Sequence, residues 1–180
     1  MKKFKNFALG EPKNVEHLKL KNRNNVMFLY AEDGTEWYGC QKTFAADTIK
    51  FSYNEKGVIR SIATNKDVSS LWPDGLSVAE VADTTANRRA DILGGWVFNG
   101  EDIVKRVYTP YELQAQAESK KEKLITSANK KTQAWQTQLM LGMISDEDKK
   151  SLMAWMNYVQ KVQAVDVSLV PNITWPDQPA

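Results

Sequence analysis

The longest stretch of this sequence without proline or glycine, residues 111–141, constrains the fold more than any other feature. A helix-start signal stands at 109–112, Thr-Pro-Tyr-Glu, with a hydroxyl at the N-cap, proline at the first helical position and glutamate at the third. Apolar residues then recur at steps of three, four or seven up to Gly142, which suits a left-handed C-cap. The pattern predicts one long helix over residues 110–141.

A second helix is predicted over residues 146–163. Ser145 suits its N-cap, and the acidic residues Asp146–Asp148 interact favourably with the helix dipole in its first turn. A calcium loop is the alternative for these carboxylates, but the alternating oxygen ligands and the central glycine of an EF-hand are missing. Because each helix carries one apolar stripe, we expect an antiparallel hairpin around Gly142. Its predicted core comprises Leu124, Trp135, Leu139, Leu152, Trp155, Val159 and Val162.

The two predicted helices differ in length. At 1.5 Å per residue, residues 110–141 span about 48 Å and residues 146–163 about 27 Å, so about 21 Å of the first helix has no partner in the hairpin. The polar segment Leu113–Lys123 occupies this part, with a narrow apolar edge at Leu113 and Ala117. Two interpretations stay open: another helix or subunit packs there, giving a homo-oligomer through the long helix, or the segment is solvated.

Residues 1–108 carry the turn signals and alternation of antiparallel strands, with turn sequences at Asp33-Gly34, Asn54–Gly57 and Asn99-Gly100. The fold class is therefore expected to be α+β: a small antiparallel β domain over residues 1–108, then the helical hairpin and an extended tail over residues 109–180. The predicted strands are 26–31 paired with 37–40, 48–53 paired with 58–63 with one buried face, 77–82, and 96–98 paired with 103–108.

Charge and hydropathy exclude several classes of partner. The chain has 24 basic and 22 acidic residues and a net charge of +2, so no overall positive field favours nucleic acid. No apolar run approaches the roughly 20 residues that span a bilayer, and Met1 is followed by lysines and asparagine rather than the apolar core of a secretory signal. We expect neither nucleic-acid binding nor membrane insertion.

The side chains that common active sites require are scarce. Cys40 and His17 are the only cysteine and histidine, too few for a structural zinc site and without a third group to orient a nucleophile and base. Cys40 is expected in the core and His17 in solvent. Gly94-Gly95 lacks the spacing and the lysine of a phosphate-binding loop. We therefore expect no catalytic residues, no metal site and no cofactor, and so no enzyme.

Two ordered sets of residues resemble the bacteriophage tail fibre assembly proteins, a family of tail fibre assembly chaperones. Together the two sets extend over nearly the whole chain. The C-terminal set is similar to the signature of that family and comprises Leu141-Gly142, Ser145–Asp148, Leu152, Ala154-Trp155, Tyr158, Val165-Asp166, Ile173–Pro176 and Pro179. The upstream set is similar to the members found in Mu-like phages and comprises Glu32–Gly34, Trp37-Tyr38, Asp47–Lys50, Pro73–Gly75, Ser77-Val78, Asn87–Asp91 and Lys105-Arg106.

The resemblance implies a chaperone without enzymatic activity. In that family the protein binds the distal, receptor-binding C-terminal tip of a trimeric tail fibre and helps it fold and trimerise without hydrolysing a nucleotide. It implies action in the cytoplasm of the host bacterium during virion assembly, and some members stay on the finished fibre tip. Residues 1–108 are then expected to be the fibre-specific part. The alternative is a structural tip subunit or adhesin that contacts a glycan on the host surface.

The candidate fibre-binding residues lie in the β domain. Arg88 and Arg89 share a loop with Asp91, and they suit bidentate contacts to carboxylates of a partner, or one of them pairs with Asp91 and shapes the loop. Exposed aromatic side chains suit a protein interface, and they are also the residues expected to contact a glycan. The candidates of this kind are Trp37, Tyr38, Trp72 and Trp96.

Overall fold

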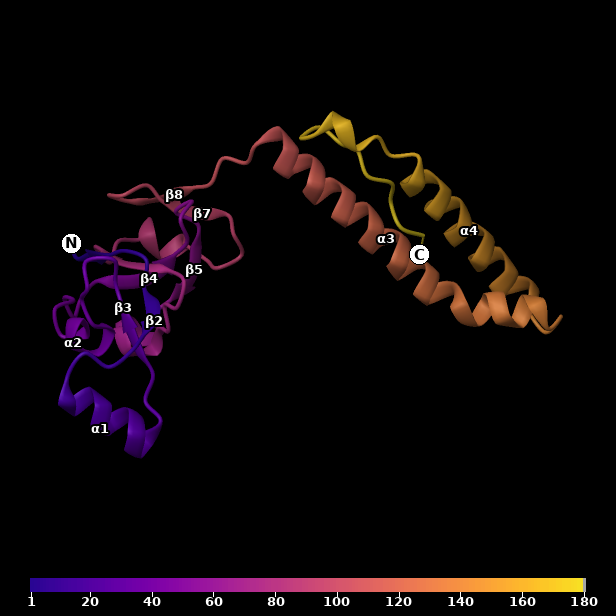
Figure 1. Ribbon diagram of the computed structural model, residues 1–180. Helices are drawn as coiled ribbons and strands as arrows, with labels where there is room; N and C mark the ends of the chain where they lie inside the picture. The colour runs from indigo at the N-terminus through magenta and orange to yellow at the C-terminus, as the bar shows by residue number, and fades with distance from the viewer. Residues whose placement is uncertain (180) are drawn as a thin grey trace. The chain divides into compact units, whose positions relative to one another are not determined.

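The computed structural model describes residues 1–179 and divides into two compact units, Met1–Arg106 and the part from Val107 onward (Figure 1). Antiparallel strands occupy the first unit and two long helices the second, so the α+β class is confirmed. None of the helices within residues 1–179 is both long and apolar enough to cross a membrane.

A four-stranded antiparallel sheet forms the centre of the first unit. Its strand order is β1-β6-β4-β5, so β6 and β4 are the inner strands. Ile49 lies opposite Val81 and Phe51 lies opposite Ile62, which brings the start of β4 to the same end of the sheet as the ends of β5 and β6. The strands are β1 (Lys3–Phe4), β4 (Ile49–Tyr53), β5 (Ile59–Ile62) and β6 (Ser77–Val81).

Both faces of the inner strands β4 and β6 are buried. Val78 belongs to one apolar cluster, whereas Ala79 and Val81 belong to another on the opposite face, as the alternation of side chains along a strand requires. The predicted single buried face of residues 48–63 is therefore wrong for β4, whereas in β5 Ile59 is buried and Arg60 is exposed. The polar face of β4 is covered as well, and Lys50 on that face is only 2% exposed.

The two strands of a second sheet are connected by a helix that the sequence patterns did not predict. The strands β2 (Ala8–Gly10) and β3 (Phe28–Tyr30) pair antiparallel, and the helix α1 (Val15–Asn24) connects them. Asn14 caps this helix by accepting a hydrogen bond from the backbone N–H of His17. No α1 side chain is fully buried, which explains why hydrophobic periodicity gave no signal for it.

The predicted strand at residues 37–40 is wrong, because this segment begins the short helix α2 (Trp37–Gln41). The preceding turn at Asp33-Gly34 is present. The Glu36 carboxylate then accepts hydrogen bonds from the backbone N–H groups of Tyr38 and Gly39, which starts a helix. One helical turn places Trp37 and Cys40 on the same side, and both are buried. Three 3-10 turns also belong to the first unit: η1 (Thr64–Lys66), η2 (Val68–Ser70) and η3 (Asn87–Arg89).

The hairpin predicted around Asn99-Gly100 is confirmed. Strand β7 (Trp96–Phe98) pairs with β8 (Ile103–Lys105), although β8 ends three residues earlier than predicted. Gly57, in the turn before β5, has a φ of +77°, and a Cβ atom there would lie 2.5 Å from the carbonyl oxygen of Phe98. Only glycine therefore allows this turn to approach the β7–β8 hairpin so closely.

The second unit is a pair of helices, and both were predicted to within one residue. Helix α3 (Pro110–Met140) begins with a complete capping box between Thr109 and Glu112, and helix α4 (Asp146–Gln163) returns beside it (Figure 1). Gly142 between them has a φ of +67°, the left-handed conformation expected for it.

Trp155 lies at the centre of the hairpin core. It is 4% exposed, its ring packs edge-on against Tyr158, and the ammonium group of Lys131 lies 4.3 Å from its ring centre. Leu139 was predicted to be in this core, but it is 47% exposed, because α4 offers only its polar first turn to the end of α3. The buried apolar residues around Trp155 in this core are Ala128, Leu152, Tyr158, Val159 and Val162, with Leu124, Ile125 and Trp135 partly buried beside them.

The chain that follows α4 folds back onto α3 (Figure 1). The ammonium group of Lys121 donates a hydrogen bond to the Val165 carbonyl at 2.9 Å, and that of Lys120 lies 4.6 Å from the ring centre of Trp175. The 3-10 turn η4 (Val167–Leu169) also contacts α3. The tail of the same chain therefore covers part of the segment Leu113–Lys123, for which a second subunit and solvent are the two predicted partners.

We expect Trp155→Ala to loosen the helical hairpin. Truncating a buried tryptophan costs about 3–5 kcal/mol, against a total stability of about 5–15 kcal/mol for a domain. Circular dichroism should show a loss of helix and an earlier thermal transition. Met153→Ala is the matched control, because Met153 lies on the same helix and is 59% exposed. An unchanged helical signal and transition in Trp155→Ala would contradict the packing of the hairpin.

Candidate functional site

Three charged side chains meet at the end of the central sheet where β5 and β6 finish. Lys66 lies in η1 after β5, Asp83 follows β6, and Arg88 lies in η3. The Asp83 carboxylate accepts hydrogen bonds from Arg88 Nε at 2.6 Å and from Arg88 Nη2 at 3.0 Å. Lys66 Nζ lies 2.5 Å from the Oδ2 atom of the same carboxylate. One carboxylate therefore holds two cations.

The cations shift the titration of this carboxyl group. Hydrogen bonds from Arg88, and then from Lys66, hold the pKa of Asp83 well below its usual range, and Asp83 in turn raises the pKa of Arg88. The side chain of Asp83 is 12% exposed, whereas those of Lys66 and Arg88 are 42% and 64% exposed. The anion is thus sheltered and the two cations face solvent.

The internal partner of the loop arginines is not Asp91. Arg88 pairs with Asp83, while Asp91 accepts the backbone N–H of Leu93, and Arg89 is exposed. A 3-10 turn has three residues per turn, so adjacent side chains point in directions about 120° apart. This geometry separates the two arginines and explains why only Arg88 reaches Asp83.

The charged groups border a cavity of about 430 Å³, which we call the Asp83 pocket. Its charged rim lies over aliphatic side chains from β4 and β5, so it offers a ligand both polar and apolar contacts. The lining residues are Ile49, Ile62, Ala63, Asn65, Lys66, Asp83, Asn87, Arg88 and Ala90.

Lys66 reaches the pocket from an unusual backbone conformation. Asn65 and Lys66 have φ values of +49° and +62°, in the left-handed region. Asparagine enters this region more readily than most residues, but lysine does so rarely, so the surrounding structure must hold it there.

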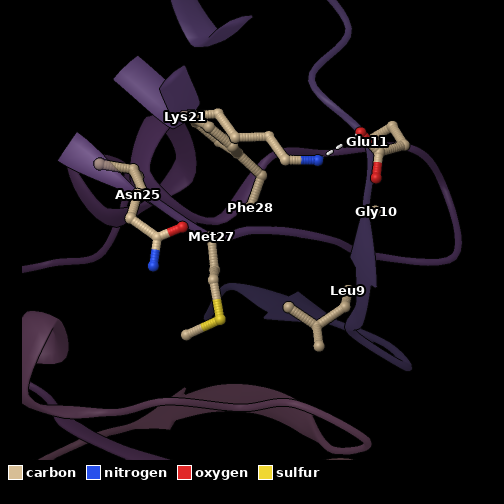
Figure 2. A pocket seen from close by; sticks show the side chains of 8 residues that line it. Leu9, Gly10, Glu11, Lys21, Asn25, Met27 and Phe28 are labelled. Atoms are coloured by element: carbon tan, nitrogen blue, oxygen red, sulfur yellow. Dashed lines mark hydrogen bonds and ion pairs between the residues drawn. The ribbon is translucent and has the colours of Figure 1, made fainter. Parts of the chain in front are cut away.

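A groove of about 450 Å³ lies beside the β2–β3 sheet, and we call it the Leu9–Met27 groove. Figure 2 shows Leu9 and Met27 at one end and the ion pair of Lys21 with Glu11, 2.6 Å long, at the other. Leu9 and Met27 are 55% and 56% exposed, which is unusual for two apolar side chains at one opening. The lining residues are Leu9, Gly10, Glu11, Lys21, Asn25, Val26, Met27 and Phe28.

Tight contacts fix the walls of this groove. A Cβ atom on Gly10 would lie 2.6 Å from the ring of Tyr30, so glycine is needed where β2 crosses that ring. His17 stacks on Phe28 with ring centroids 4.4 Å apart and an interplanar angle of 13°. The prediction that His17 is solvated is therefore wrong, because its ring attaches the polar helix α1 to β3.

Two of the four aromatic candidates are buried. Trp37 and Trp96 are 1% and 7% exposed and belong to the two core clusters, because a small unit needs large side chains to fill its interior. Neither can contact a fibre or a glycan from this position. Tyr38 and Trp72 are 45% and 43% exposed and remain available to a partner.

Cys40 lies in the core, as predicted. Its Sγ atom donates a hydrogen bond to the carbonyl of Trp37 at 3.1 Å. Within residues 1–179, no group of three or more histidine, cysteine, aspartate or glutamate side chains is arranged to hold a metal ion.

Comparisons with known proteins agree over most of the chain. The family described as Caudovirales tail fibre assembly protein, lambda gpK, matches residues 39–180. The chain is 48% identical over 179 residues to "Tail fiber assembly protein U'" of Escherichia phage Mu, which covers 99% of both chains. It is 46% identical to the protein of the same name in Escherichia phage P1 and 40% identical to "Tail fiber assembly protein U" of phage Mu, each with 99% of both chains covered.

Of the residues that line the Asp83 pocket, Arg88 was predicted as a site residue, whereas its partners Asp83 and Lys66 were not. The Asp83–Arg88 pair spans five residues of a loop, and Lys66 joins it only through the tertiary fold. For the Leu9–Met27 groove, the available signal was the helix cap at Asn14, which marks the start of α1.

We expect the Cys40 thiol to react slowly in the folded protein. Burial, and next the negative charge of Glu36, raises the pKa of Cys40 to about 12, so little thiolate exists at pH near 8. Labelling with Ellman's reagent should be on the order of a hundredfold slower than in guanidinium chloride. Equally fast labelling in both conditions would contradict the burial of this side chain.

Proposed function

This chain belongs to the family of Caudovirales tail fibre assembly proteins and has a role in tail fibre assembly, and on that premise we propose that it is a chaperone of the fibre. In this proposal it binds the distal, receptor-binding C-terminal tip of a trimeric tail fibre and promotes the folding and trimerisation of that tip. The binding takes place in the cytoplasm of the host bacterium, and residues 1–108 form the fibre-specific part.

The physics of a trimeric β-rich fibre supports such a helper. Long-range and inter-chain contacts form slowly, so unassembled chains expose strand edges and apolar side chains that favour aggregation. A protein that covers those groups until the partner chains arrive requires complementary binding surfaces and no chemical step.

The Leu9–Met27 groove is the observation that carries the proposal. All three residues of β2 are exposed, and β2 lies at the edge of its two-stranded sheet. Leu9 and Met27 extend the apolar area at this edge, and methionine adapts its shape to different side chains. An extended, apolar segment of the fibre chain fits this surface, with its side chains in the groove and its backbone beside β2.

The test is co-expression of the chain with the fibre gene beside it. We expect the two proteins to copurify and the fibre to become a soluble trimer. Met27→Glu should weaken the complex about tenfold or more, which is about 1.4 kcal/mol, because it places a charge in the apolar groove. Val104→Glu is the control, since Val104 is also partly exposed in the first unit but lines neither the groove nor the Asp83 pocket.

Two outcomes would contradict the proposal. If the fibre forms soluble trimers without this chain, no chaperone is needed, and a stoichiometric presence of the chain in virions would then favour a structural tip subunit or adhesin. If Met27→Glu and Val104→Glu weaken the complex equally, the groove is not the fibre-binding surface.

A further inference from the structure

The Asp83 pocket has more positive than negative charge. Lys66 and Arg88 face one carboxylate, so the cluster carries a net charge of +1. Among the ion pairs within residues 1–179 that involve either cation, Asp83 is the only acidic partner. A second carboxylate at the rim would balance the cluster.

The geometry leaves donors for that second carboxylate. A guanidinium group has five N–H donors in one plane, and Asp83 takes the edge formed by Nε and Nη2 of Arg88. The edge formed by Nη1 and the outer hydrogen of Nη2 remains, and it matches the spacing of two carboxylate oxygens. The ammonium group of Lys66 has three donors, and its ion pair with Asp83 needs only one of them.

Asp83 holds both cations in place before any ligand arrives. The bidentate contact fixes the plane of the Arg88 guanidinium, and the contact with Lys66 restrains a long, flexible side chain. The left-handed backbone at Asn65 and Lys66 aims that side chain at the pocket. Restraint of this kind lowers the entropy that a ligand would otherwise have to supply.

The floor of the pocket determines what accompanies the carboxylate. Ile49, Ile62, Ala63 and Ala90 provide aliphatic contacts beside the charged groups. The volume of about 430 Å³ is in the range of small-molecule sites, which leaves room for a carboxylate together with a neighbouring apolar side chain.

We propose that the Asp83 pocket binds a carboxylate of the fibre chain that stands next to an apolar side chain, with the carboxylate on Lys66 and Arg88 and the apolar group on the aliphatic floor. This inference rests on the proposed function, because it takes the fibre as the partner. A phosphate dianion fits less well, since the carboxylate of Asp83 lies between the two cations and repels the additional charge.

Two sources in the fibre share this chemistry: its C-terminal carboxylate and an internal aspartate or glutamate side chain. The probes are N-acetyl-leucine, which has a terminal carboxylate, and N-acetyl-leucyl-glutamate amide, which has only a side-chain carboxylate. N-acetyl-leucinamide has the same apolar group without the charge and serves as the control ligand. Binding is followed by chemical shifts of backbone amides in the isotope-labelled full-length chain.

We expect one or both acids to shift the amides of residues 65–66, 83 and 87–90 saturably, and the amide control to leave them in place. Binding of the terminal acid alone assigns the site to a chain end, and binding of the glutamate probe assigns it to an internal acidic residue. Equal shifts with acid and amide, or no shift with either acid, would overturn the proposal.

Matched variants test whether acid binding depends on the two cations of the pocket. Lys66→Gln and Arg88→Gln should each weaken acid binding about tenfold, whereas Arg89→Gln should not change it, because Arg89 lies outside the pocket. The melting temperature of each variant shows whether it is folded. If Arg89→Gln weakens binding as much as Arg88→Gln, general surface charge explains the effect and the pocket proposal fails.

The two proposals fail in distinguishable ways. If the unchanged chain and both pocket variants solubilise the fibre equally well, and no acid probe binds, then the chaperone function stands and the pocket inference is overturned. If the unchanged chain does not bind the fibre at all, the proposed function fails, and this inference about its partner fails with it whatever the small probes show.

Discussion

The buried carboxylate of Glu80 is the interaction on which the first unit depends. Glu80 lies on the inner strand β6, is 3% exposed, and accepts hydrogen bonds from the backbone N–H groups of Lys2 and Ala45 and from the Thr48 hydroxyl. A buried carboxylate is tolerated only where such donors surround it. The contact with Lys2 fixes β1 at one edge of the sheet, and the other two fix the loop that enters β4. These contacts hold both segments in place beside β6.

The two candidate sites use this framework differently. The Asp83 pocket lies where β5 and β6 end, and the ion pairs with Asp83 hold its two cations in fixed positions. The Leu9–Met27 groove lies beside an edge strand, and its exposed Met27 side chain can adapt to apolar groups of different shape. A protein that holds an incompletely folded chain benefits from both properties. In the proposed chaperone function, the adaptable surface would accept variable segments and the fixed one would set their register.

Local signals predicted the elements that local physics determines. The capping box at Thr109 and the Asn99-Gly100 turn act within a few residues, and each was found where it was predicted. Trp37 was assigned to a strand because a turn precedes it, but the carboxylate of Glu36 caps a helix there. The Asp83 pocket was beyond prediction for another reason. Its cations come from separate segments, and Lys66 occupies a backbone conformation that its residue type disfavours.

The titration behaviour of the aspartates shows how the pocket keeps its charges. The pKa values of Asp33, Asp67, Asp83 and Asp166 are all lowered by hydrogen-bond donors, which are N–H and O–H groups of turns except at Asp83, where they are Arg88 and Lys66. For a carboxyl group with a lowered pKa, the stabilisation is complete above its ordinary pKa and is lost as the pH falls through the lowered value. Neutral pH is far above that range, so Asp83 stays ionised and continues to orient Arg88.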